Sequence, residues 1–262
     1  MNSGLKGKVA IVAASSEGIG RAAAESFAAE GANLAICSRS EEKLQKTAAE
    51  IRAKYGVEVF AQTVDVRDSK SVTMFVDTVQ RKLGRVDVCV TNSGGPPAKP
   101  FLSLNDEEWK NSVDLCLMSH VYFCRAAIPH MQKQRGGAIV MISSLVVKQP
   151  ETALALSSSI RPAIMGLTRT LANEFGASAI RVNNVGPGYT MTSRQEELAQ
   201  ARAAASGVSA EEVKKGYAAD VPLGRTAQPQ EIADAIVWLA SDRASYVTGQ
   251  TVIVDGGKYR GL

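Results

Sequence analysis

Short apolar segments alternate with longer amphipathic ones along the whole chain, and this alternation constrains the fold more than any other feature. The apolar segments lack clean polar–apolar alternation, so they are typical of strands buried on both faces. Strands separated by helices indicate a parallel sheet with helices on both faces. The sequence therefore predicts an α/β fold, a Rossmann-type doubly wound sheet of about seven parallel strands, in a single domain over residues 1–262.

The expected strands and helices follow directly from this pattern. The strands are expected at 9–14, 33–38, 57–64, 86–92, 138–143, 180–185 and 250–256. The helices are expected near 19–30, 41–54, 69–83, 105–133, 160–175, 194–217 and 229–240. The stretch 190–217 is polar and rich in alanine, which suggests a mobile helical lid over a substrate site. An ordinary solvated helix is equally compatible with that composition.

Charge and cysteine usage exclude several classes of protein. The 30 Lys and Arg are interspersed with 26 Asp and Glu, giving a net charge of +4, so nucleic-acid binding is not expected. No apolar run approaches the length of a membrane span, and the N-terminus leads directly into the first strand without a signal-peptide pattern. The four cysteines lack metal-binding spacing, so we expect buried reduced thiols, no metal site and a cytoplasmic location.

A nucleotide-binding pattern occupies the first strand–helix junction. Gly18 and Gly20 open a helix directly after the first strand, where backbone N–H groups at the positive helix end can bind a pyrophosphate. Arg39 ends the second strand, 21 residues after Gly18, where an acidic residue would bind ribose hydroxyls. An arginine there favours a 2′-phosphate, so NADP(H) is expected over NAD(H). The negative charge of nearby Glu17 mildly disfavours a phosphate at this place. The alternative is that Arg39 is an ordinary surface arginine.

These and further motifs resemble the short-chain dehydrogenase/reductase family over nearly the whole chain, with general likeness to the 3-oxoacyl-carrier-protein reductases. The matching segments are "AASSEGIG" (13–20), "DVRD" (65–68), "TNSGG" (91–95), "VNNVGPGYTMT" (182–192) and "YVTGQTVIVDGG" (246–257). The resemblance implies a homotetramer or homodimer. It also implies cofactor contacts from Ser15, Ser16, Gly18, Ile19, Gly20, Ser38, Arg39, Asp65, Val66, Asn92, Arg161, Pro187, Gly188 and Thr192.

The catalytic positions depart from the family pattern of Asn, Ser, Tyr and Lys. Ser144 matches the family serine, but the tyrosine position holds Ser157, the lysine position Arg161 and the asparagine position Cys116. Arg161 keeps the positive charge and can hold the nicotinamide ribose, although a guanidinium does not carry protons. Ser157 is a much weaker acid than tyrosine, so the proton is expected from water or from an unassigned group. We expect Ser144, Ser157 and Arg161 to form the altered catalytic site.

The helix that carries these residues has an unusual start. Three serines, 157–159, precede Pro162, and proline is comfortable only in the first turn of a helix. The sequence therefore predicts that the helix begins near 158–160, with Ser158 or Ser159 as its cap. Ser157 and Arg161 would then not lie one regular turn apart, and a helical hydrogen bond between them would contradict this prediction.

Other side chains could in principle replace the missing proton donor. His120 lies four residues after Cys116 on the same helix face, but a lone histidine there is more often packed in the core. His130 is expected to be structural or exposed. Lys148 and Glu151 lie in the loop after Ser144, where a charge is more often solvated.

Three functions are compatible with this pattern. The favoured one is an NADP(H)-binding oxidoreductase that interconverts a small-molecule carbonyl and alcohol, because cofactor placement dominates hydride transfer. The second is a catalytically silent NADP(H)-binding sensor or assembly protein, favoured by the loss of Tyr, Lys and Asn together. The third is a non-redox enzyme resembling the halohydrin dehalogenases, which also carry Arg in place of Lys but lack the glycine loop.

Overall fold

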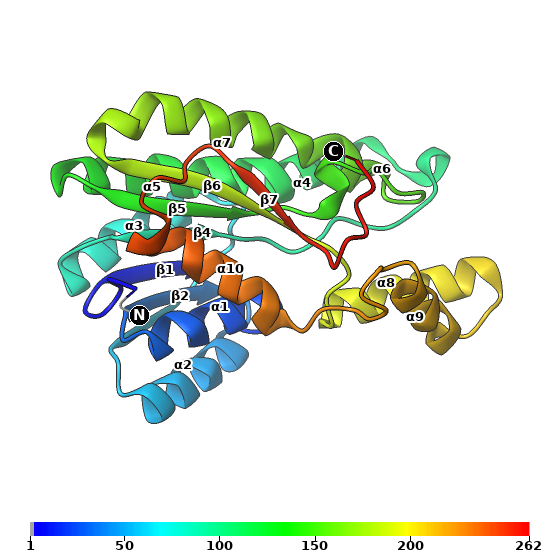
Figure 1. Cartoon of the computed structure of the whole chain (residues 1–262), viewed down its shortest axis with the longest axis horizontal. Helices are drawn as coiled ribbons and strands as arrows, with labels where there is room; N and C mark the ends of the chain where they lie inside the picture. Colours follow the sequence, from blue (N-terminus) through cyan, green and yellow to red (C-terminus); the bar gives the residue numbers. More distant parts are fainter. Residues whose placement is uncertain (1–2, 262) are drawn as a thin grey trace.

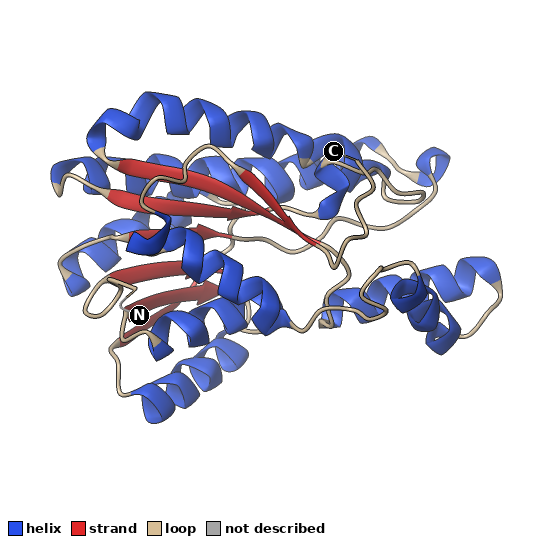
Figure 2. Cartoon of the chain, in the orientation of Figure 1, coloured by secondary structure: helices blue, strands red, loops and turns tan. Residues whose placement is uncertain are grey.

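A seven-stranded parallel sheet organises the protein, whose computed structural model describes residues 3–261 (Figure 1, Figure 2). The strand order is β3-β2-β1-β4-β5-β6-β7, which confirms the predicted doubly wound sheet. The strands are β1 (Val9–Ala13), β2 (Asn33–Ser38), β3 (Val59–Thr63), β4 (Val88–Thr91), β5 (Gly137–Ile142), β6 (Ile180–Pro187) and β7 (Thr251–Val254).

Helices cover both faces of the sheet, as Figure 1 shows. One face packs on α1 (Gly18–Ala29), α2 (Glu41–Tyr55) and α10 (Pro229–Ala240), and the other on α3 (Ser69–Leu83), α5 (Ser119–Lys133) and α7 (Pro162–Phe175). Successive strand residues face opposite sides: Val12 joins the first core, whereas Ile11 and Ala13 join the second. Burial on both faces explains why the strand segments are continuously apolar.

The chain order places a crevice at the carboxyl end of the sheet. After β1, β2 and β3 the chain returns to lay β4 on the other side of β1. The connections that follow β1 and β4 therefore diverge, and a ligand can enter between them at this topological switch point. The predicted glycine loop follows β1 and begins α1 at this crevice.

The helix predicted at 105–133 is continuous but changes its winding. It consists of α4 (Asp106–Val113), one π-helical turn η2 (Asp114–Met118) and α5. Cys116 lies in the π turn, fully buried against Leu156 and Ile160. The other three cysteines are also buried and unpaired, which confirms the expected free thiols.

The segment proposed as a lid contains two helices rather than one. Gly207 adopts a left-handed conformation (φ 72°) that ends α8 (Ser193–Ser206), and Ser209 forms a capping box that starts α9 (Ala210–Ala219). In Figure 1 both helices lie beyond the carboxyl edge of the sheet, apart from the helices on its faces. Their mobility stays a prediction.

The predicted helix start at 158–160 is wrong. Helix α6 (Ala155–Ile160) begins earlier, with the Ser158 N–H donating to the Leu154 carbonyl (2.8 Å). The Arg161 N–H donates to the Ser157 carbonyl (3.1 Å), so the chain continues through Arg161 into α7 with little deviation. Pro162 is the first residue of α7, where its missing N–H is tolerated.

Short helical turns complete the described elements: η1 (Phe101–Ser103), η3 (Leu145–Val147), η4 (Gly176–Ser178) and η5 (Asp242–Ala244). Within residues 3–261, no helix is long and apolar enough to cross a membrane.

Candidate functional site

A cavity of about 470 Å³ opens at the carboxyl edge of the sheet, and it collects most of the predicted site residues. They come from the loop after β1, the ends of β2, β4, β5 and β6, the loop after β3, and α6 with its junction to α7. The predicted residues that line it are Ser16, Gly18, Ile19, Ser38, Arg39, Val66, Asn92, Ser144, Ser157, Arg161, Pro187, Gly188 and Thr192.

Two predicted residues of the glycine loop, Ser15 and Gly20, lie behind the cavity wall and do not line the cavity. Ser15 is fully buried, and its hydroxyl donates to the Val12 carbonyl (2.9 Å), which holds the turn after β1. A side chain at Gly20 would collide with the Ala14 carbonyl, so this glycine lets α1 pack against the loop. Gly18 has a φ of 60° and lines the cavity at the start of α1. The loop and the start of α1 therefore lie against the cavity, where backbone N–H groups at a helix N-terminus can bind a phosphate.

Asp65 is the third predicted residue that does not line the cavity. Its carboxylate accepts hydrogen bonds from the Arg67 side chain, at 2.6 Å for the shortest, and from the Arg67 backbone N–H at 3.0 Å. This arginine lowers the pKa of Asp65. Val66, the next residue, does line the cavity, so an adenine contact from this segment stays a prediction centred on Val66.

The end of the cavity near β2 is positively charged. Arg39 is exposed and forms no ion pair within the part of the chain that the structure describes. Lys43 in the first turn of α2 also lines the cavity, and its ammonium lies 3.1 Å from a Glu17 carboxylate oxygen. Glu17 further accepts from the Ser193 hydroxyl (3.2 Å), so its charge is largely compensated. Sequence reasoning missed Lys43, although its spacing of four residues from Arg39 at a helix start was a usable signal.

Arg161 is a buried cation whose polar contacts are backbone carbonyls. The residue is 6% exposed, and its guanidinium donates to the carbonyls of Ser143 and Gly94, each at 3.1 Å. No carboxylate pairs with it among residues 3–261. Because an unpaired buried charge is costly, this arrangement favours an anionic or hydroxyl-rich ligand in the cavity.

Ser157 and Ser144 line the cavity beside Arg161. Ser157 lies one helical turn before Arg161 and is 8% exposed. The Ser144 hydroxyl oxygen accepts from the Val146 N–H (3.4 Å), which leaves its own O–H free to donate. No tyrosine is present among the described residues that line this cavity.

His120 is packed in the core, as is more common for a lone histidine on an apolar helix than a catalytic role. It is fully buried, and its Nδ1 lies 2.6 Å from the Thr91 hydroxyl. Burial lowers the pKa of His120 to about 3, with a further contribution from the charge of Arg161. The imidazole is therefore neutral near pH 7. His120 also does not line the cavity. His130 instead pairs with Asp77 at 2.8 Å on the protein surface.

Glu151 lies at the centre of an ion-pair cluster that the sequence did not reveal. Its carboxylate accepts from the Tyr189 hydroxyl (3.2 Å) and contacts Arg202 of α8 (2.7 Å) and Lys258 near the C-terminus (3.3 Å). Lys258 also pairs with Asp220. The cluster joins the loop after β5 to α8, to the C-terminal end of α9 and to the C-terminal segment. The neighbouring Lys148 is exposed to solvent and does not line the cavity.

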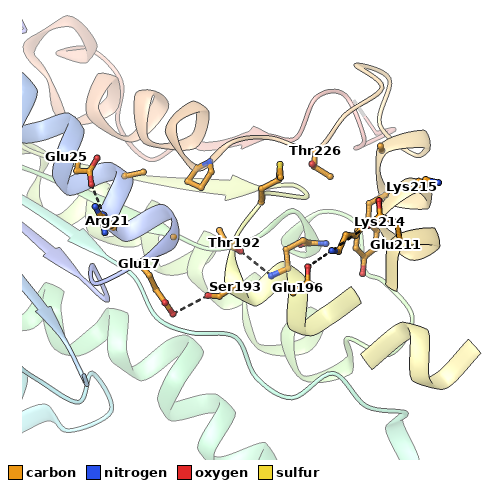
Figure 3. A pocket seen from close by; sticks show the side chains of 17 residues that line it. Glu17, Arg21, Glu25, Thr192, Ser193, Glu196, Glu211, Lys214, Lys215 and Thr226 are labelled. Carbon is orange, nitrogen blue, oxygen red and sulfur yellow. Dashed lines mark hydrogen bonds and ion pairs between the residues drawn. The ribbon is translucent and has the colours of Figure 1, made fainter. Parts of the chain in front are cut away.

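A larger cavity of about 870 Å³ lies between α1, the lid helices and the start of α10 (Figure 3). Its charged side chains mostly satisfy one another, as the dashed lines between Arg21 and Glu25 and between Lys214 and Glu196 show. The predicted catalytic side chains line the smaller cavity instead. We therefore place the candidate active site there, despite its smaller volume.

The doubly wound sheet, with a glycine-bearing helix start at its switch point, defines the Rossmann class of protein. A family model described as enoyl-(acyl carrier protein) reductase matches residues 13–258. The chain is 36% identical over 257 residues to the 3-oxoacyl-(acyl-carrier-protein) reductase FabG of Chlamydia muridarum, covering 98% of this chain and 99% of that protein. It is 37% identical to the oxidoreductase UcpA of Salmonella typhimurium, covering 97% of this chain and 95% of that protein. The chain therefore belongs to the short-chain dehydrogenase/reductase family of oxidoreductases.

Two solved structures are similar over nearly the full length. L-sorbose reductase from Gluconobacter frateurii, complexed with NADPH and L-sorbose, has a TM-score of 0.94 and 33% identity, with 100% of each chain covered. A short-chain oxidoreductase from Pseudomonas aeruginosa PAO1, bound to NADPH and containing an atypical catalytic center, has a TM-score of 0.89 and 31% identity, covering 97% of this chain and 98% of that chain.

Proposed function

We propose that this chain is an NADP(H)-dependent oxidoreductase that interconverts a small-molecule carbonyl and its alcohol with an altered catalytic site. The observation that carries the proposal is the convergence of most of the predicted cofactor residues and of Ser144, Ser157 and Arg161 on one cavity. Two relatives of similar structure are NADPH complexes, which supports the choice of cofactor.

Residues that line the cavity would hold the diphosphate, the 2′-phosphate and the nicotinamide end of such a cofactor. The backbone N–H groups from Gly18 onward would bind the diphosphate at the positive end of α1. Arg39 and Lys43 would hold the 2′-phosphate, since both line the same end of the cavity. Arg161 would hold the nicotinamide ribose through its remaining N–H donors, and Thr192 would face the nicotinamide amide. When bound, NADP(H) supplies the hydride for carbonyl reduction or accepts it in alcohol oxidation.

The chain's own residues would orient the substrate oxygen and stabilise its charge. The Ser144 hydroxyl would donate to that oxygen, because in its contact with the Val146 N–H it acts as an acceptor and its own O–H stays available. The buried cation of Arg161 would stabilise negative charge that develops nearby. Ser157 would hold a water molecule that delivers the proton, because a serine hydroxyl is itself a poor acid.

A binding and turnover measurement tests this proposal. NADPH and NADH would be titrated by nucleotide fluorescence, and turnover would be followed on a broad panel of carbonyls and alcohols. We expect tight NADPH binding, weaker NADH binding and slow turnover that Ser144→Ala abolishes. Tight binding without turnover on any substrate would contradict the enzymatic function.

That contrary outcome would support a second function, a catalytically silent NADP(H)-binding sensor or assembly protein. Two observations favour it: no tyrosine lines the described cavity, and Cys116 is packed away in a separate apolar cluster. A cytoplasmic location and a homotetramer or homodimer stay predictions under either function.

A further inference from the structure

Arg194 crosses the mouth of the candidate active site. It lies in the first turn of α8, and its guanidinium donates to the carbonyl of Pro96 in the loop after β4. The same group lies 3.1 Å from the exposed carboxylate of Glu197. Arg194 lines the cavity together with Ser144 and Ser157.

The charges that line this cavity are unevenly distributed. The titratable lining residues among residues 3–261 are Glu17, Arg39, Lys43, Arg161 and Arg194. The single carboxylate, Glu17, is held beside the glycine loop by Lys43 and Ser193. The guanidinium groups of Arg161 and Arg194 have no carboxylate partner among the lining residues, because Glu197, which pairs with Arg194, is exposed and does not line the cavity. The lining charge is therefore net positive and attracts anions.

The start of α8 adds further donors to the same region. Thr192 caps this helix by accepting from the Gln195 N–H (3.2 Å), so the positive end of a 14-residue helix lies at the cavity. Gln195 lines both this cavity and the larger one beside it, and its side-chain amide nitrogen is buried without a hydrogen-bond partner among the described residues. A buried donor without a partner is costly, which favours a ligand with acceptor oxygens here.

We propose that Arg194 binds a carboxylate of the substrate, so that the substrates are small oxo acids and the corresponding hydroxy acids. The planar guanidinium matches a carboxylate through two parallel hydrogen bonds. The cavity of about 470 Å³ must also hold the nicotinamide end of the cofactor, so the acid is small. In the reductive direction, the oxo carbon would gain a hydride, with NADPH as the two-electron reductant, and its oxygen would gain a proton from solvent. The carboxylate would be unchanged.

This inference rests on the proposed function, so its first test avoids turnover. Butanoate and butanamide, which have nearly the same shape but differ in charge, would be titrated into the NADPH-loaded protein while the nucleotide fluorescence is followed. We expect butanoate to bind at least about tenfold more tightly, consistent with a charge-assisted hydrogen-bonded pair. Arg194→Met is expected to remove this preference, and Arg194→Lys to retain part of it. Equal binding of the two ligands to the unaltered protein would overturn the proposal.

The second test compares 4-oxopentanoate with its methyl ester as substrates. Arg194→Met is expected to raise KM for the acid at least about tenfold, with little change in kcat, and to change the ester by less than about twofold. Glu197→Gln is the matched control: it removes the exposed partner of Arg194, and the acid is expected to keep or improve its KM. Equal loss for acid and ester would identify Arg194 as a structural clamp and overturn the proposal. A butanoate preference without turnover of any substrate would support the carboxylate site and contradict the enzymatic function.

Discussion

The backbone N–H of Arg161 donates to the carbonyl oxygen of Ser157, and this 3.1 Å hydrogen bond places the two residues one helical turn apart. Both residues line the same cavity, as the prediction that they occupy the family's tyrosine and lysine positions requires. We therefore expect the candidate site to differ from the family pattern in its side-chain chemistry rather than in its backbone.

Restoring the tyrosine and lysine should raise turnover. In the double variant Ser157→Tyr with Arg161→Lys, the lysine can bring the phenol toward neutrality, and general acid catalysis typically contributes about 10²–10⁴-fold. We expect at least a tenfold rise in turnover on the carbonyl panel and a new ionisation in the pH–rate profile. The control is Ser157→Phe with Arg161→Lys, which fills nearly the same volume without a hydroxyl. If the phenylalanine control is as fast as the tyrosine variant, Ser157 does not occupy the acid position.

Lys43 should contribute to the selectivity for a 2′-phosphate. Lys43→Met is expected to weaken NADPH binding about tenfold and to leave NADH binding within about twofold, because only NADPH carries the extra phosphate. Fluorescence titration at two salt concentrations measures this, and the NADPH loss should shrink at high salt. Glu17→Gln is the matched variant: it frees Lys43 from its 3.1 Å ion pair and should hold or improve NADPH affinity. Equal weakening of both nucleotides would argue against a phosphate contact.

His120 should make the protein less stable in acid. Its pKa is about 3 in the folded protein, mainly because of burial, against about 6.5 in the unfolded chain. Between these values the unfolded chain binds a proton that the native protein does not, so the free energy of unfolding falls as pH falls. His120 is expected to lower the free energy of unfolding by up to about 1.4 kcal/mol for each pH unit, and this effect ends near pH 3.

Replacing this histidine should flatten that dependence. Urea unfolding from pH 7 to pH 4 would compare the unaltered protein with His120→Asn, which keeps a polar group near Thr91. The change in the free energy of unfolding with pH, rather than its value at any one pH, distinguishes the unaltered protein from His120→Asn. Parallel slopes would show that His120 is not the group that titrates.

Glu151 should stabilise the packing of the lid helices and the C-terminal segment. Glu151→Gln removes the carboxylate that contacts Arg202 and Lys258, and Lys258 is 5% exposed. We expect a loss of about 2 kcal/mol in the free energy of unfolding, together with faster proteolysis in 193–219. The exposed pair of Arg194 and Glu197 provides the comparison, because Glu197→Gln should cost about 0.5 kcal/mol or less. A similar small loss for both variants would contradict a stabilising role of the cluster.

The predicted helix start failed because local preference competes with packing. A serine cap contributes about 1 kcal/mol, which favoured a start at Ser158 or Ser159. The structure instead begins α6 at Ala155 and buries Leu156 completely and Ile160 almost completely beside Cys116. Burying two such side chains contributes about 1.5–3 kcal/mol each, which outweighs the cap.

By itself the sequence determined the seven parallel strands, the glycine loop and the place of Arg39 at the end of the second strand, because each is a local pattern in strand and helix periodicity or spacing. The catalytic roles of Ser144, Ser157 and Arg161 stay predictions. Only the tertiary structure decided that Lys43 lines the cavity, that Glu151 joins α8 to the C-terminal segment, and that Arg194 reaches Pro96. The last contact joins residues 98 positions apart. Such contacts arise from how whole helices pack at the edge of the sheet, and no local pattern encodes which distant side chains will meet there.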